Sequence, residues 1–150
     1  PYRSESQYFI AVNRLALDRQ KGVSELAALG KSNVSEVGPL SKFALAQAYE
    51  SDGKLQEAAQ LYSDLAKQNS LTISSETANL GLAKVYVKLG KKKEAADVLF
   101  NIVDASRKAK GDDNRPLPQT EAVREAAEEL KKIDPERFAQ LPPEGSFLAG

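Results

Sequence analysis

The chain has 150 residues, of which 41% are hydrophobic and 28% are charged, and its 21 basic and 21 acidic side chains cancel to a net charge of zero. This composition is typical of one globular domain, and the balanced charge gives no reason to expect nucleic acid or an acidic membrane as the partner. Cysteine, histidine and methionine are absent, which excludes disulfides and thiolate chemistry and removes the commonest general base and metal ligand.

Residues 2–31 are predicted to form two helices. The first opens with capping-box spacing over residues 4–7, in which the two ends of the motif satisfy free amides of the first turn. Apolar residues then recur at helical spacing and predict one apolar stripe, made of Tyr8, Phe9, Val12, Leu15 and Ala16. Gly22 is expected to break this helix, and a short second helix is expected to end near Gly30.

Four helices are predicted in the middle of the chain, at about residues 40–51, 55–67, 76–89 and 92–108. Asp52-Gly53 and Gly90 supply the turns within the two pairs, because glycine takes the left-handed conformation that closes a helix. Ser74 or Ser75 is a candidate cap for the third of these helices. The sequence therefore predicts two antiparallel helical hairpins lying side by side.

The C-terminal part begins with a polar stretch over residues 110–119 that contains two prolines and is predicted to be a surface loop. Helical periodicity returns at Thr120 and continues to Ile133, in a helix expected to cover the last hairpin. Asp134-Pro135-Glu136 has the order of a cap, a proline and an acid that starts a further short helix. Residues 141–150 are predicted to be a flexible tail.

An internal repeat is the most informative pattern in the chain. Residues 45–66 and 82–103 align without a gap at a spacing of 37 residues. Eight pairs are identical: Leu45/Leu82, Ala46/Ala83, Tyr49/Tyr86, Gly53/Gly90, Lys54/Lys91, Glu57/Glu94, Ala58/Ala95 and Ala59/Ala96. A period in this range is typical of a solenoid built from one repeated supersecondary unit.

The repeated segment resembles the tetratricopeptide repeat, in which small residues sit at the helix crossings and a large residue fills the gap between hairpins. The matching structural positions are Ala46, Tyr49, Gly53, Ala58 and Tyr62 in the first repeat and Ala83, Tyr86, Gly90, Ala95 and Leu99 in the second. The chain departs from the family pattern because it has no tryptophan, lacks the proline near each repeat's end, and has an apparent insertion at residues 71–75.

The resemblance implies an all-α fold of antiparallel helix hairpins, a tetratricopeptide-like α-solenoid with flanking capping helices. One domain is expected over residues 1–140. Its expected parts are N-terminal helices at 2–31, repeats at about 39–72 and 76–109, and capping helices at 120–140.

The resemblance also implies a concave groove lined by the first helix of each repeat. The groove candidates are Leu40, Phe43, Gln47, Glu50, Thr77, Leu80, Lys84, Val87 and Lys88. In one interpretation, Phe43, Leu80 and Val87 anchor an extended or helical partner segment. In the other, Phe43 and Leu80 pack against the N-terminal helices.

A basic cluster extends from Lys84 to Lys110, where eight basic and three acidic residues give a net charge of +5. Such a cluster can steer an acidic protein or lipid headgroups. The alternative is a solvated face whose lysines complement the dipole at a helix C-terminus.

Together these patterns favour a protein-interaction scaffold that binds a protein or peptide segment. The layout is also similar to periplasmic tetratricopeptide domains of membrane-anchored bacterial envelope proteins, and this resemblance implies a role in bacterial envelope assembly or secretion. The alternative is a structural subunit that associates with itself and fills its groove with a neighbouring copy. No cofactor, metal site, catalytic residue or nucleic-acid contact is expected, because no catalytic motif occurs. The resemblance implies an exported, periplasmic chain held by an N-terminal anchor outside this sequence, with a cytoplasmic location as the alternative.

Overall fold

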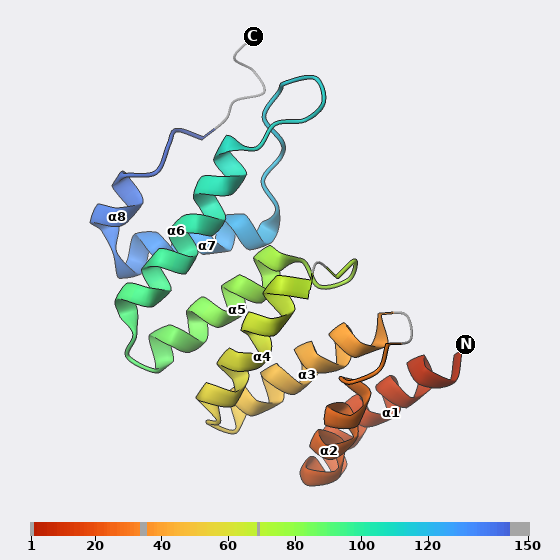
Figure 1. The fold of residues 1–150 in the computed structure, drawn as a ribbon. Coiled ribbons are helices and arrows are strands. Elements are labelled where there is room, and N and C mark those ends of the chain that lie inside the picture. The colour runs from red at the N-terminus through yellow and green to blue at the C-terminus, as the bar shows by residue number, and fades with distance from the viewer. Residues whose placement is uncertain (1, 34–35, 69, 145–150) are drawn as a thin grey trace. The chain divides into compact units, whose positions relative to one another are not determined.

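The computed structural model describes residues 2–33, 36–68 and 70–144, with eight α-helices among them (Figure 1). They are α1 (Tyr2–Leu17), α2 (Arg19–Leu29), α3 (Val37–Ser51), α4 (Leu55–Gln68), α5 (Ser75–Lys88), α6 (Lys92–Lys108), α7 (Glu121–Ile133) and α8 (Pro135–Ala139). An isolated bridge between Lys110 and Pro116 is the only β pairing in these ranges. The all-α prediction is confirmed, and the four middle helices lie within a few residues of their predicted bounds.

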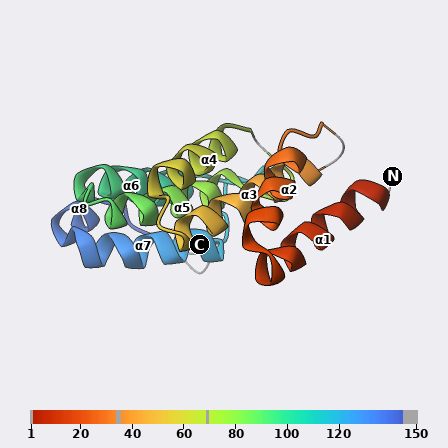
Figure 2. The same ribbon diagram turned by 90° about the horizontal axis from the view of Figure 1, so that it is seen from below.

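The chain divides into two compact units, Pro1–Gly81 and Leu82–Gly150, with the boundary inside α5. Neighbouring helices pack within each unit: α1 with α2 and α3 with α4 in the first, and α6 with α7 and α8 in the second (Figure 2). This is the consecutive pairing of a helical-repeat fold. A single domain over residues 1–140 stays a prediction.

The core of the first unit has two clusters of buried side chains. Ala11, Leu26 and Leu45 join α1, α2 and α3 in one cluster. Leu65 and Ile73 belong to the other, which lies on the opposite side of α3 against Leu40 and Phe43. The helix α3 is thus held on two sides by apolar packing, which is why its own sequence is nearly continuous in apolar residues.

The junction between α1 and α2 corrects the expected role of Gly22. The first helix ends at Leu17, where the Asp18 side chain caps α2 by accepting a hydrogen bond from the Lys21 amide over 3.2 Å. Gly22 lies inside α2, and a Cβ there would be 2.7 Å from the backbone nitrogen of Leu15. The glycine therefore lets α1 and α2 approach closely instead of breaking a helix.

The α3–α4 and α5–α6 turns have the same geometry. Gly53 and Gly90 both have a φ of 79°, in the left-handed region that favours glycine. In each turn the residue after the glycine, Lys54 or Lys91, donates its amide to the carbonyl of the repeat tyrosine over 2.8 Å. The predicted turn glycines are confirmed.

The small and large positions of the repeat are mostly buried, as the repeat pattern predicts. The buried ones are Ala46, Ala58, Tyr62, Ala83, Ala95 and Leu99. Within the first unit, the Tyr62 ring packs against α5 at a position where a Cβ on Gly81 would lie 2.6 Å away from it. Tyr62 thus fills the space next to the following helix, and the glycine is required for that contact.

In the second unit, α7 buries Val123, Ala126 and Leu130 and packs on α6. The predicted cap Asp134 is present and accepts from the Arg137 amide over 3.0 Å, and Thr120 caps α7 by accepting from the Val123 amide over 3.3 Å. Arg137 also lies 4.4 Å from the centre of the Phe100 ring on α6. A capping bond and a cation–π contact therefore fix the short helix α8.

The predicted tail begins in described residues and continues beyond them. The carbonyl of Pro142 accepts a hydrogen bond from Arg107 over 3.0 Å, so this part of the tail contacts α6. Residues 145–150 lie outside the described residues, and their flexibility stays a prediction.

Candidate functional site

Two of the predicted groove anchors on α3 take part in packing inside the first unit. Leu40 and Phe43 lie against the buried cluster that contains Leu65 and Ile73. The Phe43 ring meets the Tyr62 ring edge to face, with centroids 6.0 Å apart. These partners belong to α4 and the segment before α5, not to the N-terminal helices that the alternative interpretation named.

Glu50, a third groove candidate on α3, is tied to Tyr62. The Tyr62 hydroxyl donates a hydrogen bond to the Glu50 carboxylate over 3.0 Å. Burial of the ring, followed by the nearby negative charge of Glu50, raises the pKa of Tyr62 well above its usual range. Gln47 is the only exposed groove candidate on α3.

The candidates on α5 differ in exposure. In the first unit, Thr77 receives a hydrogen bond from Ser74 at the start of the helix, and Leu80 is only 6% exposed. In the second unit, Lys84 forms an ion pair with Glu125 of α7. Val87 is 39% exposed, and Lys88 is exposed as well. A common groove over α3 and α5 stays a prediction.

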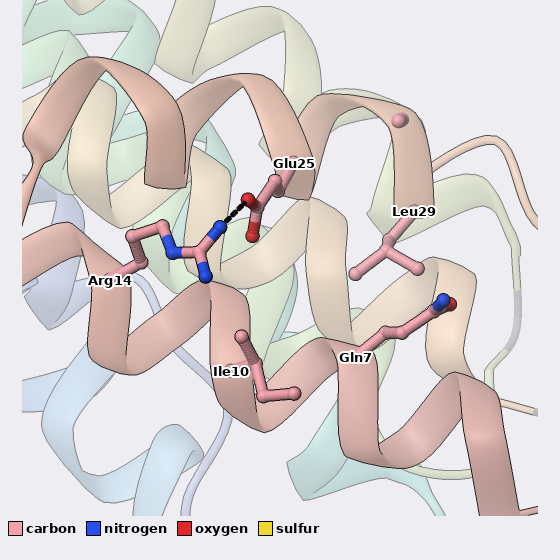
Figure 3. A pocket seen from close by; sticks show the side chains of 6 residues that line it. Gln7, Ile10, Arg14, Glu25 and Leu29 are labelled. Carbon is pink, nitrogen blue, oxygen red and sulfur yellow. Dashed lines mark hydrogen bonds and ion pairs between the residues drawn. The ribbon is translucent and has the colours of Figure 1, made fainter.

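A cleft between α1 and α2 was not among the predicted sites. It has a volume of about 360 Å³. Its lining residues are Gln7, Ile10, Arg14, Glu25, Ala28 and Leu29. Figure 3 shows the ion pair between Arg14 and Glu25 on one side, Gln7 and Leu29 on the other, and Ile10 between them.

Next to this cleft, α1 exposes a row of large apolar side chains, here called the α1 row. Its members are Phe9, Ile10 and Leu17, which are 63%, 50% and 89% exposed. Ile10 and Leu17 are seven residues apart, so they lie on the same side of the helix two turns from each other. The row gives the cleft an apolar margin.

The α1 row corrects the predicted apolar stripe. Tyr8, Val12 and Leu15 pack toward the core as expected, but Phe9 and Ala16 are exposed. The core position between them is Ala11, which is fully buried. Phe9, Ile10 and Leu17 lie within about 100° of one another around the helix, away from the side that faces the core. The consecutive pair Phe9-Ile10 was the signal of this second apolar face.

The carboxylate of Glu36 in the first unit has a structural role. The carboxylate of Glu36 accepts hydrogen bonds from the Ser70 hydroxyl over 2.6 Å and the Leu71 amide over 3.0 Å. These hydrogen bonds lower the pKa of Glu36. They fix the segment that the sequence marks as an insertion, and Leu71 on it is 93% exposed.

Within residues 2–33, 36–68 and 70–144, no group of three or more acidic side chains is placed to hold a metal ion. In the same ranges, no helix has the length and apolar character needed to cross a membrane. That the chain is not an enzyme and needs no cofactor stays a prediction.

Comparison with known proteins gave no relative: no family model, curated protein or solved structure matches this chain. The resemblance to the tetratricopeptide repeat therefore rests on the internal repeat.

Proposed function

We propose that this chain is a helical-repeat interaction module that binds an apolar segment of another protein along α1 and the α1–α2 cleft. The observation that carries the proposal is the α1 row, three large apolar side chains exposed on one helix. An exposed apolar group of this kind beside a cleft is typical of a protein-binding surface. Covering it contributes roughly 25 cal/mol for each Å² of apolar area removed from water.

The polar groups at the margin of the cleft can orient a partner on this surface. The Arg14–Glu25 pair and the Gln7 amide place polar groups at the cleft margin, whereas Ile10 and Leu29 are apolar. Polar groups around an apolar centre orient a partner while the apolar contacts supply most of the affinity. A helix or extended segment with apolar residues on one side and polar ends fits this arrangement.

The test immobilises the chain and identifies the proteins that it captures from an extract of the source cells. It compares variants of this chain at two exposed apolar sites. We expect the wild type to capture a defined set of proteins, and the double variant Ile10→Ser, Leu17→Ser to lose them. The control variant Leu71→Ser removes a leucine that is 93% exposed and does not line the α1–α2 cleft, and it should capture the same set as the wild type. Equal capture by both variants, or no specific capture by the wild type, contradicts the proposal.

Self-association is the second candidate, and the zero net charge favours it because copies of the chain do not repel one another. In that case a second copy covers the α1 row. Light scattering over a range of concentrations decides: a growing mass that Ile10→Ser, Leu17→Ser abolishes supports self-association, and a constant monomer contradicts it.

We also propose an exported location, in the bacterial envelope. Support comes from the absence of cysteine and from the resemblance of the repeat. Fractionation of cells that produce the tagged product of the full-length gene tests it, and recovery in the cytoplasmic fraction contradicts it.

A further inference from the structure

The α5–α6 turn of the second unit carries a concentration of lysines. Lys88, Lys91, Lys92 and Lys93 are all exposed, within a span of six residues. Glu94, which follows directly, is the only acidic residue next to them. We call these four residues the lysine turn.

The α3–α4 turn shows that the hairpin does not need this charge. The two turns share their hydrogen bonds and their glycine conformation. The two turns share a lysine at one repeat position, Lys54 in the first and Lys91 in the second. Each lies over its repeat tyrosine, with the amine 5.6 and 5.8 Å from the ring centre. The other three lysines stand where the first repeat has Ser51, Leu55 and Gln56.

Two of the extra lysines lie where their positive charge is unfavourable for the helix. Lys92 and Lys93 are the first two residues of α6, and no side chain caps this end. The first turn of a helix carries partial positive charge from its free amides, so cations there are unfavourable. The interpretation in which the cluster complements a helix C-terminus thus fits Lys88 in the last turn of α5 and Arg107 and Lys108 in the last turn of α6, but it does not fit Lys92 and Lys93.

Glu94 lies in the first turn of α6 beside Lys92 and Lys93, but no ion pair joins it to either lysine in the part of the chain that the structure describes. Neither side chain forms an ion pair there, whereas Lys84 and Lys108 in the same unit pair with Glu125 and Asp104. The unpaired positive charge lowers the stability of the first turn of α6. Binding of an anion outside the chain would offset this cost.

We propose that the lysine turn binds an anionic phospholipid surface, independently of the protein-binding function above. Two features favour lipid over an acidic protein. The four cations are lysines without an arginine, and lysine acts as a mobile point charge while arginine is preferred for paired recognition of carboxylates. Val87, 39% exposed beside the turn, adds an apolar group that can contact the lipid interface.

Because the turn is the end of a helical hairpin (Figure 1), its side chains can reach a flat surface. A lysine near an anionic membrane raises the binding constant about fivefold, and salt screens the effect. Removal of two lysines is therefore expected to weaken binding on the order of twentyfold.

The experiment measures co-sedimentation of the whole chain with vesicles of phosphatidylcholine alone, or mixed equally with phosphatidylglycerol, at low and high salt. The wild type should bind the mixed vesicles at low salt and neither the neutral vesicles nor the mixed ones at high salt. The variant Lys92→Gln, Lys93→Gln should lose binding by the stated factor while its melting temperature stays equal or rises, since two unfavourable charges leave the first turn of α6.

A matched control changes the same charge at the other end of α6. The variant Lys108→Gln, Lys110→Gln should bind vesicles nearly as well as the wild type. The single variants Lys92→Gln and Lys93→Gln should each lose about fivefold, which keeps the test valid if the double variant misfolds.

Three results overturn the proposal: equal binding to neutral vesicles, unchanged binding by the Lys92→Gln, Lys93→Gln variant, or equal losses in the two double variants. Binding of polyglutamate in place of vesicles also overturns it and assigns the turn to an acidic protein. Loss of vesicle binding leaves protein capture by the α1 row intact, so the two proposals fail separately.

Discussion

The α3–α4 turn and the α5–α6 turn share a backbone but differ in most of the side chains around it. Lys54 and Lys91 each donate their amide over 2.8 Å to a tyrosine carbonyl, and Gly53 and Gly90 have the same φ of 79°. Around this common frame, the second turn has three more lysines than the first. The shared residues are those that the hairpin requires, and the differing ones are available for binding.

A second difference lies between the helices of each hairpin. The first repeat joins Glu50 to the Tyr62 hydroxyl over 3.0 Å, and the second places Val87 and Leu99 at the equivalent positions. The first repeat thus has a hydrogen bond between two side chains that the second repeat replaces with an exposed valine and a buried leucine. Single substitutions in the two repeats can test the shared and the differing contacts separately.

The largest expected effect comes from the small positions that both repeats share. Ala58 and Ala95 are fully buried, so tryptophan at either site must displace a packed helix. We expect Ala58→Trp and Ala95→Trp each to lower the free energy of unfolding by about 3 kcal/mol or more. Thermal melts that match the wild type for both variants would show that the helix crossings are misplaced.

The turn glycines should give the next largest effect, and an equal one. A Cβ on Gly53 or Gly90 would meet no atom within 4 Å, so only the left-handed backbone conformation opposes a side chain there. Gly53→Ala and Gly90→Ala should each cost about 1–2 kcal/mol in urea unfolding. Unequal costs, differing by more than the smaller of the two, would mean that the turns are not equivalent.

Removal of the Tyr62 hydroxyl should affect only the first repeat. Tyr62→Phe is expected to cost about 1 kcal/mol, because it removes a hydrogen bond to a charged group. Tyr49→Phe keeps the ring at another position of the same hairpin and serves as the control.

The pH dependence tests whether the buried Tyr62 hydroxyl must stay protonated in the folded chain. The pKa of Tyr62 is raised in the folded chain, so the protonated hydroxyl contributes stability that is present below about pH 10 and is lost at higher pH. Unfolding free energies of the wild type and Tyr62→Phe should therefore converge as the pH rises above about 10. A constant difference between them would show that neither burial nor Glu50 raises the pKa of Tyr62 on folding.

The smallest expected effect is local. Glu36→Gln weakens the hydrogen bonds that hold Ser70 and Leu71, so exchange of the Leu71 amide should become severalfold faster at nearly unchanged melting temperature. The pKa of Glu36 is lowered in the folded chain, so its contribution is present above about pH 4.3 and is lost as the pH falls. The same amide should thus exchange faster, relative to its intrinsic rate, in acid. Unaltered exchange in the variant would show that Glu36 does not hold this segment.

Local signals in the sequence predicted the helices and their turns well. The predicted caps Ser74 and Asp134 act on amides three residues away, and the turn glycines act on their own backbone. The repeat predicted the buried alanines because both copies carry them. These features depend on neighbours in the sequence, which is why the sequence reveals them.

Features that depend on distant residues were missed or misread. Glycine is a common helix breaker, so the sequence predicted that role for Gly22. Only its closeness to Leu15 on the neighbouring helix shows that it allows the two helices to pack. The contact between Glu36 and Ser70 joins residues 34 positions apart. The exposed side of α1 was missed because Phe9 was assigned to the apolar stripe and Ile10 beside it was not considered, whereas the packed side of the helix contains Ala11 instead.

Amide hydrogen exchange at Lys54 and Lys91 tests most directly the claim that the two hairpins are one structure formed twice. Each amide donates to a tyrosine carbonyl over the same distance, although both side chains are exposed. We predict that both amides are protected to a similar degree, well beyond those of the exposed residues around them. Protection at one lysine with unprotected exchange at the other would contradict the claim.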